Sequence, residues 1–229
     1  GSAAAATIIS QYISAGLCLY LLLTTAGTHR IILSKIKIHK EYLGEILKYG
    51  LPSGFQNSII GLANVVVQSN INSFGDMAMA GCGAYSKIEG FAFLPITSFT
   101  MALTTFVGQN LGARQYDRVL KGAKFGMMCS MTLAEIIGVI IFVFGSQFIA
   151  AFDATPEVIQ FGTLRGQTSA FFFCLLAYSH CVSAILRGAG KSMVPMIVMM
   201  VCWCFVRVAG LTIMGMLIHN IWCVYWIYP

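Results

Sequence analysis

The chain has 229 residues, of which 58% are hydrophobic and 10% are charged, and its mean hydropathy is +0.80. This composition excludes an ordinary soluble globular domain and indicates an all-α, polytopic membrane protein. The formal net charge of +6 raises nucleic acid as a partner, so the positions of the basic residues have to be considered.

Stretches of about 20 mostly apolar residues, the length that crosses a membrane as a helix, occur six times. They lie near residues 3–26, 49–74, 77–110, 125–150, 160–186 and 192–217, and another stretch starts at 221. We therefore expect a helix bundle with six complete spans and the start of a seventh. The chain begins without Met and ends inside an apolar run, and we expect it to be a fragment of a multi-pass protein of the plasma or inner membrane.

Basic residues are confined to every second connection between the spans. The connections after the first, third and fifth spans carry Arg30, Lys35, Lys37, Lys40, Lys48, Arg114, Arg118, Lys121, Lys124, Arg187 and Lys191. The other connections carry Asp76, then Asp153 and Glu157, then no formal charge. This alternation follows the positive-inside rule, so we expect the basic connections to lie in the cytoplasm. The partner that we expect is the lipid bilayer and not nucleic acid. Residues 30–50 are either an amphipathic helix on the inner leaflet or a solvated loop with a helical end.

The second span carries a polar stripe. Its members recur at spacings of three and four residues, which places them on one helical face; they are Gly54, Asn57, Gly61, Asn64, Gln68 and Asn72. In lipid such a stripe either forms hydrogen bonds between helices or lines a hydrated cavity. We favour the cavity, with Asn57, Asn64 and Gln68 as pathway residues; Ser53 and Gln56 lie off the stripe and are weaker candidates.

The third span contains Lys87 and Glu89 inside its apolar run. A charge in hydrocarbon costs roughly 2.5 to 3.5 kcal/mol on insertion scales, so such residues are usually functional. The two side chains point about 200° apart on a helix and cannot pair with each other. We expect both Lys87 and Glu89 to belong to the substrate or ion pathway, where the carboxylate titrates or contacts a cationic substrate. Fixed ion pairs with other helices are the alternative. Pro95 predicts a kink, which serves either as a hinge or only for packing.

Other ionisable residues lie inside later spans. We expect Glu135 of the fourth span and Arg207 of the sixth to belong to the substrate or ion pathway, although a fixed ion pair is a strong alternative for Arg207. Arg165 lies nearer the outer end, and we expect it to snorkel towards the membrane surface. His180 is interpreted as a hydrogen-bonded packing residue, with a proton carrier as the alternative.

Patterns for metal binding and for membrane-embedded enzymes are missing from the sequence. The eight cysteines fall in or beside apolar spans without a C-x-x-C pair, and the four histidines form no H-E-x-x-H pattern. We therefore expect no metal site, no cofactor and no enzymatic activity. A membrane-embedded enzyme remains the least favoured alternative.

Three segments resemble the multidrug and toxic compound extrusion (MATE) transporters. They are LPSGFQNSIIGLANVVVQSNINSFG, AYSKIEGFAFLPITSFTMALTTFVGQNLGARQYDRV and ILRGAGKSMVPM, of which Gly108 to Arg114 and Leu186 to Lys191 are the most specific parts. The resemblance implies a twelve-helix, two-lobe fold. Residues 1–26 would then be the last helix of the amino-terminal lobe, 27–48 the cytoplasmic linker, and 49–229 a truncated carboxyl-terminal lobe.

The resemblance also implies a function, namely efflux of small lipophilic or cationic compounds in exchange for H⁺ or Na⁺. The missing amino-terminal lobe of the same chain would be a partner in this transport. One branch of the family places acids at positions that correspond to Ile60 and Leu176, both apolar here. The chain is therefore more similar to the DinF-like than to the NorM-like branch. Related flippases of lipid-linked oligosaccharides are the alternative, but these should have a strongly basic cavity.

Overall fold

The computed structural model describes residues 2–25, 27, 30–33, 36–217 and 225–226, and the regular structure of these residues is entirely helical. The helices are α1 (Ser2–Thr24), α2 (Lys40–Asn72), α3 (Asp76–Gly112), α4 (Tyr116–Ala150), α5 (Pro156–Ala170), α6 (Phe173–Gly188), α7 (Met193–Met200), the π-helix η2 (Val201–Val206) and α8 (Arg207–Leu217). The chain divides into two compact units, Gly1–Ile46 and Leu47–Pro229.

The first unit contains α1, a helix of apolar and small residues that ends at Thr24. The chain beyond this end folds back on the last turn, because the amide of Ile31 donates to the carbonyl oxygen of Leu22 and Nε of Arg30 donates to that of Leu23. These bonds satisfy two carbonyl groups that the helix end leaves without partners.

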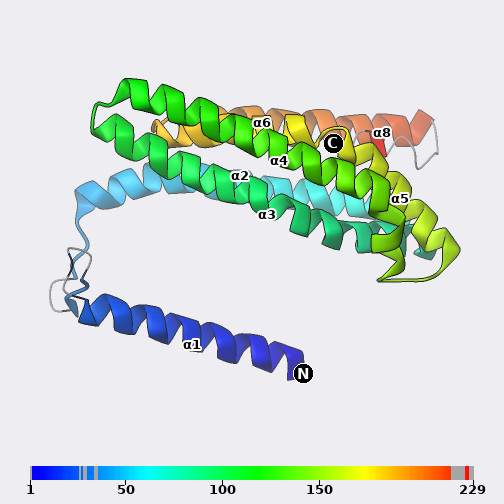
Figure 1. The fold of residues 1–229 in the computed structure, drawn as a ribbon, viewed down its shortest axis with the longest axis horizontal. Helices are drawn as coiled ribbons and strands as arrows, with labels where there is room; N and C mark the ends of the chain where they lie inside the picture. The colour runs from blue at the N-terminus through cyan, green and yellow to red at the C-terminus, as the bar shows by residue number, and fades with distance from the viewer. Residues whose placement is uncertain (1, 26, 28–29, 34–35, 218–224, 227–229) are drawn as a thin grey trace. The chain divides into compact units, whose positions relative to one another are not determined.

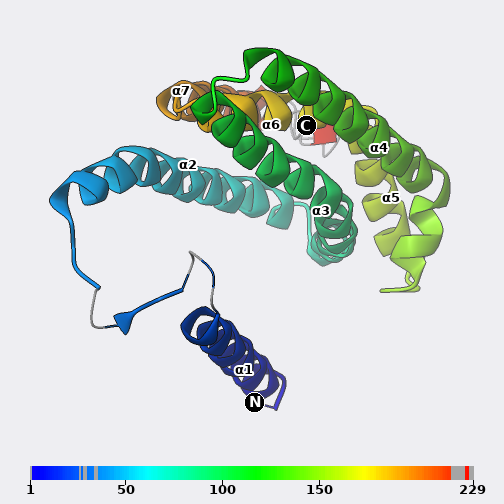
Figure 2. The same ribbon diagram turned by 60° about the vertical axis from the view of Figure 1, so that its left-hand side comes forward.

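The second unit is built around α3, which packs against α4, α5 and α6; α4 in turn packs against α5 and α6. Both ribbon views show α3 and α4 running alongside each other (Figures 1 and 2). The main apolar core lies between these helices and includes Tyr85, Ile96, Ile141 and Phe173. A second cluster joins Val67 and Ile71 of α2 to residues of α3 and α8. The candidate site described below lies next to both clusters.

Glycines allow two close approaches between helices. A Cβ at Gly81 of α3 would lie 2.6 Å from the carbonyl oxygen of Val158, and one at Gly162 of α5 would lie 2.8 Å from the carbonyl oxygen of Gly81. At the other end of α3, a Cβ at Gly188 would lie 2.6 Å from the carbonyl oxygen of Thr104. Small residues at these crossings let the backbones pack directly, as is common in membrane bundles.

The two most specific sequence segments form the same type of helix end. Arg114 has φ 57° and Gly190 has φ 77°. In each case the next residue donates its amide to a carbonyl five positions back, Gln115 to Asn110 and Lys191 to Leu186. This is the Schellman arrangement, which ends a helix through a residue in the left-handed region. The basic connections after α3 and α6 thus start from a sharply defined turn.

Four of the described helical segments are long and apolar enough to cross a membrane: Ala5–Thr24, Asp76–Gly112, Tyr116–Ala150 and Met193–Ile213. A fifth results if α5 and α6, which meet at an angle of 56°, form one broken span. The sequence predicted one span near 160–186 but did not predict the bend, since no proline or glycine lies at Phe171 and Phe172. The predicted second span, 49–74, lies mostly within α2, which is not among the four segments. The amides of its polar stripe lower the hydropathy of this helix. The predicted seventh span lies mostly outside the described residues.

Helix α3 continues without interruption through Pro95. The hinge role of Pro95 therefore stays a prediction. Departures from regular α-helix occur instead between α5 and α6 and at η2, which directly precedes Arg207. Short π-helical segments are often found at functional sites.

Candidate functional site

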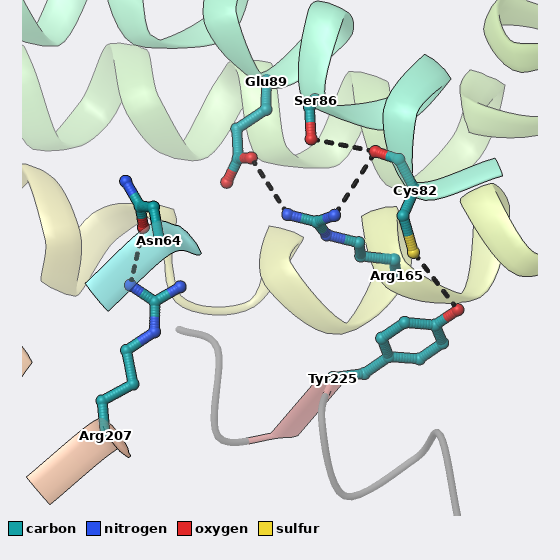
Figure 3. Close-up of polar contacts among 7 residues, drawn as sticks. All are labelled: Asn64, Cys82, Ser86, Glu89, Arg165, Arg207 and Tyr225. Atoms are coloured by element: carbon teal, nitrogen blue, oxygen red, sulfur yellow. Dashed lines mark hydrogen bonds and ion pairs between the residues drawn. The ribbon is translucent and has the colours of Figure 1, made fainter. Parts of the chain in front are cut away.

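A buried guanidinium connects α5 to α3. The side chain of Arg165 is 3% exposed, and its Nη2 lies 3.7 Å from Oε2 of Glu89. Its Nη1 donates to the carbonyl oxygen of Cys82 at 3.3 Å, and the guanidinium lies 5.3 Å from the ring centroid of Tyr85. Figure 3 shows Arg165 extended between Cys82 and Glu89. Arg165 thus contacts two successive turns of α3.

The expectation that Arg165 snorkels to the membrane surface is wrong. Gly162 and Gly166 flank it on α5, and Gly166 packs against the ring of Tyr85 while Gly162 packs against Gly81. The close crossing brings the base of the Arg165 side chain between the two helices, where α3 supplies a carboxylate, a carbonyl oxygen and an aromatic face. The spacing of the two glycines around an arginine was the available signal for this position.

Cys82 and its neighbours extend the polar cluster. The carbonyl oxygen of Cys82 also accepts a hydrogen bond from Oγ of Ser86 at 2.9 Å, and its Sγ lies 3.7 Å from Oη of Tyr225 (Figure 3). Tyr225 is buried. Cys82 and Tyr225 could not be predicted from the sequence, because their proximity depends on contact between segments 143 residues apart.

Lys87 and Glu89 point in different directions, as their spacing predicted. Lys87 is exposed, and its Nζ lies 5.3 Å from the ring centroid of Phe152, beyond the end of α4. Glu89 instead faces Arg165 and keeps 19% of its side chain exposed. Only Glu89 therefore joins the central polar cluster, and the opposite charge that faces it comes from α5.

Glu89 opens into a cavity of about 450 Å³ between α2, α3, α6 and α7. Among its walls are Asn64 of the predicted stripe, Phe93, His180 and Ile60. Asn64 and Glu89, both predicted from the sequence as pathway residues, thus line one cavity. Ile60, the position at which the resemblance would place an acid in another branch, lies on the same wall.

Arg207 approaches the stripe from α8. It is buried, and its Nη1 donates to Oδ1 of Asn64 at 3.3 Å (Figure 3). One turn earlier, in η2, Sγ of Cys204 donates to the carbonyl oxygen of Ile59 at 3.6 Å. Asn64 therefore links Arg207 to the cavity that contains Glu89. The partner is a neutral amide, so the fixed ion pair considered for Arg207 stays a prediction.

The other predicted pathway residues lie elsewhere. Asn57 and Gln68 are exposed on α2, and Nε2 of Gln68 donates to Oδ1 of Asn72, along the same face. Gln56, off the stripe, is buried. Glu135 is exposed on α4 and lines a different cavity. The stripe thus forms an exposed polar face, and Glu135 is not part of the Glu89 cluster.

His180 contributes an imidazole to the cavity wall. Its Nδ1 lies 3.0 Å from the carbonyl oxygen of Leu176, and its ring packs edge-on against Phe93. A wall with one carboxylate, one amide, one imidazole and aromatic or apolar surface can bind a cation that also has an apolar body. Among the described residues no group of three metal-ligating side chains comes together.

Residues 52–213 match the MatE family model. This chain belongs to the MatE family. The match covers α2 from its proline to most of α8, so every residue of the cluster except Tyr225 lies inside the family domain.

Curated MatE relatives include proteins named for drug resistance. A probable multidrug resistance protein NorM of Thermotoga maritima is 27% identical over 198 residues, covering 86% of this chain and 42% of that protein. YpnP of Bacillus subtilis, also a probable multidrug resistance protein, is 28% identical over 162 residues, covering 71% and 36%. An FAD transporter of Shewanella oneidensis is 23% identical and covers 69% and 35%. The chain therefore spans well under half the length of these relatives.

Solved structures share the fold. A transporter of the MOP superfamily from Pyrococcus furiosus superposes with a TM-score of 0.88 at 20% identity, over 98% of this chain and 51% of that one. A MATE structure in complex with MaL6 gives the same TM-score at 19% identity, again over 98% and 51%. The predicted fold class, a membrane helix bundle that corresponds to half of a MatE transporter, is confirmed.

Proposed function

We propose that this chain forms one lobe of a secondary active exporter in the cell membrane, which moves small lipophilic cations outward in exchange for H⁺ or Na⁺. Glu89 is the ionisable group through which this lobe takes part. The observation that carries the proposal is its position: the carboxylate contacts a buried guanidinium on one side and opens to a cavity on the other.

The charge state of Glu89 determines what the cavity can hold. As a carboxylate it attracts a cation, while Arg165 competes for the same oxygen atoms. Protonation removes the negative charge, which weakens both attractions at once and releases the cargo. A cation or proton that binds Glu89 thus changes the contact between α3 and α5, and this is how occupancy of the cavity can bias one helix arrangement over another.

Asn64, which is contacted by Arg207, supplies a second polar part of the wall. The hydrogen bond from Arg207 orients the amide of Asn64, so the amide nitrogen is left to face the cavity or the exposed stripe of α2. We propose that this stripe, with Asn57 and Gln68, faces a hydrated pathway shared with a second lobe. Lys87 lies outside this pathway and anchors α3 against Phe152.

The names of the relatives support the direction of the proposal. Two of the three relatives above are probable multidrug resistance proteins. The cavity has Glu89 as the only ionisable carboxyl group among its described lining residues, with no Lys or Arg. This lining does not favour a lipid-linked oligosaccharide with its pyrophosphate.

The test is transport by the full-length protein in proteoliposomes. A fluorescent lipophilic cation should be moved against its own gradient when a proton or a sodium gradient is imposed, and the ion that supports movement identifies the coupling ion. Glu89→Gln should reduce the initial rate at least tenfold after normalisation to the amount of folded protein, because the change also breaks the buried pair with Arg165. Glu157→Gln, the same change at an exposed carboxylate in the first turn of α5, should transport like the wild type.

Two results would overturn the proposal. Dye movement that is independent of either gradient contradicts coupled export. Equal transport by the Glu89→Gln and Glu157→Gln proteins shows that Glu89 has only a structural role in the pair with Arg165.

A further inference from the structure

A groove of about 630 Å³ follows one face of α4, away from the Glu89 cavity. Its residues recur at spacings of three and four, as expected for one helical face, and α6 contributes Cys174 to the wall. The residues that matter here are Met128, Met131, Glu135, Ile136, Val139 and Cys174. Within the part of the chain that the structure describes, no residue lines both the groove and the Glu89 cavity.

Of the described residues that line the groove, Glu135 alone is charged. It lies near the middle of α4, with about 20 Å or more of helix on either side. Because α4 is long and apolar enough to cross a membrane, the carboxyl group lies at a depth where charged side chains are rare and usually functional.

Glu135 makes no hydrogen bond or ion pair with the part of the chain that the structure describes. This distinguishes it from Glu89, whose carboxylate faces Arg165. The opposite faces of α4 pack against α3, α5 and α6, and the buried Ala134 and Gly138 lie on those faces. Glu135 therefore points away from the bundle, together with exposed Met128, Ile136 and Val139.

The lining defines the chemistry of an occupant. Flexible thioethers and branched aliphatic side chains adapt to apolar bodies of various shapes, and the volume is within the range of small-molecule sites. A single carboxylate complements a single positive charge, whereas a second charge on the ligand would meet apolar wall and an anion would meet the carboxylate. We propose that this groove binds lipophilic monovalent cations through Glu135, at a site separate from the Glu89 cavity.

The site can be read out without measuring transport, because Cys174 lies in the wall. The full-length protein is placed in phosphatidylcholine nanodiscs and treated with N-ethylmaleimide, and labelling of each cysteine is followed by mass spectrometry. Tetraphenylphosphonium should slow labelling of Cys174 at least threefold. Cys129, a cysteine of intermediate exposure on α4 that does not line the groove, should be labelled at an unchanged rate.

Variants separate this site from the proposed export pathway. Glu135→Gln should abolish the protection of Cys174, and Glu89→Gln should leave it intact. Val139→Trp, which fills the groove at an exposed position and retains Glu135, should also abolish it, so the proposal stays testable if Glu135→Gln fails to fold. Protection in the Glu89→Gln protein supports the groove site whether or not Glu89 couples transport.

Tetraphenylborate serves as the matched control ligand, because it has the same shape and the opposite charge. It should not protect Cys174. Equal protection by both ions, or protection that persists in Glu135→Gln, shows that the groove is only a lipid-facing apolar surface and overturns the proposal. Unchanged labelling of Cys174 in the wild type with tetraphenylphosphonium overturns it as well.

Discussion

Arg165 on α5 and Glu89 on α3 face each other at 3.7 Å, in a part of the bundle where the arginine is 3% and the glutamate 19% exposed. The asymmetry matters, because the guanidinium depends on α3 for its contacts while the carboxylate still reaches the cavity. A pair of this kind can hold the helices together and still respond to a ligand on the carboxylate side.

The first prediction concerns the loss of the arginine. Arg165→Gln should destabilise the full-length protein by about 3 kcal/mol, the lower end of the range for breaking a buried pair, since Glu89 can be solvated through the cavity. Adding Glu89→Gln to this variant should recover part of the lost stability, because a neutral amide then replaces the carboxylate that Arg165→Gln leaves without its cation. Thermal unfolding in detergent measures both changes.

The control for this cycle is Arg118→Gln. Arg118 is exposed near the start of α4 and makes a 3.4 Å hydrogen bond to Gln115. Arg118→Gln should change the free energy of unfolding by less than about 0.5 kcal/mol. If Arg165→Gln behaves like Arg118→Gln, the buried pair does not stabilise the contact between α3 and α5.

The second prediction concerns the glycine crossing that positions Arg165. Gly81→Ala should lower the free energy of unfolding by about 2 kcal/mol or more. Its Cβ would lie 2.6 Å from the carbonyl oxygen of Val158, so one of the two helices would have to shift. Gly83→Ala, two residues along the same helix, meets nothing within 4 Å. It should stabilise α3 by about 0.5–1 kcal/mol, the ordinary helix preference for alanine.

The two alanine variants are compared by urea or thermal unfolding of the same full-length protein. In transport assays Gly81→Ala should also be impaired, since a displaced α5 moves Arg165 away from Glu89. Equal stability of the two variants would show that the close approach of α3 and α5 is not required.

The sequence supplied the helices and one polar face, but not the partners across helices. The alternation of basic connections and the apolar runs predicted most spans, because hydropathy is a local property. The stripe through Asn64 and the isolation of Glu89 from Lys87 followed from helical spacing alone. The partner of Glu89 could not be predicted in this way, since Arg165 lies 76 residues further along the chain and is brought near by the Gly81–Gly162 crossing.

The break between α5 and α6 also had no sequence signal. Phe171 and Phe172 are not helix breakers, and the bend is associated with packing: Phe171 meets the ring of Phe142 edge-on, and Nε2 of Gln167 donates to the carbonyl oxygen of Phe142 at 3.5 Å. Local propensity is overridden here by contacts between helices, which a single sequence does not reveal.

The third prediction is a pH dependence at the connection between α4 and α5. The carboxylate of Asp153 accepts a hydrogen bond from the side chain of Thr155 and another, at 2.9 Å, from the backbone amide of the same threonine. These bonds lower the pKa of its carboxyl group below the ordinary value. The stabilisation of this turn is therefore fully present above the ordinary pKa and is lost as the pH falls through the lowered one.

Hydrogen exchange of the Thr155 amide, corrected for the intrinsic rate at each pH, measures this effect. Protection should be constant from pH 7 to about pH 5 and decline in more acidic solution. Asp153→Asn retains an oxygen acceptor without the charge and should give weaker protection that does not vary with pH. Glu157→Gln should keep the wild-type profile, and a pH dependence that persists in Asp153→Asn would assign the effect to another group.

The fourth prediction concerns the contact that joins α8 to the stripe of α2. Asn64→Leu removes the oxygen that accepts from Arg207 at 3.3 Å, so one donor of a buried guanidinium loses this partner. The cost should be about 1–3 kcal/mol, as for other buried groups that lose a hydrogen bond. Asn57→Leu is the same change about two helical turns earlier on the same exposed face of α2. It removes no such acceptor, and its stability should be within about 0.5 kcal/mol of the wild type.

Because Asn64 also lines the Glu89 cavity, Asn64→Leu should in addition weaken binding of a lipophilic cation to the full-length protein, measured by equilibrium dialysis. Equal stability of the two leucine variants would mean that Arg207 is held by its other contacts and that Asn64 serves the cavity alone.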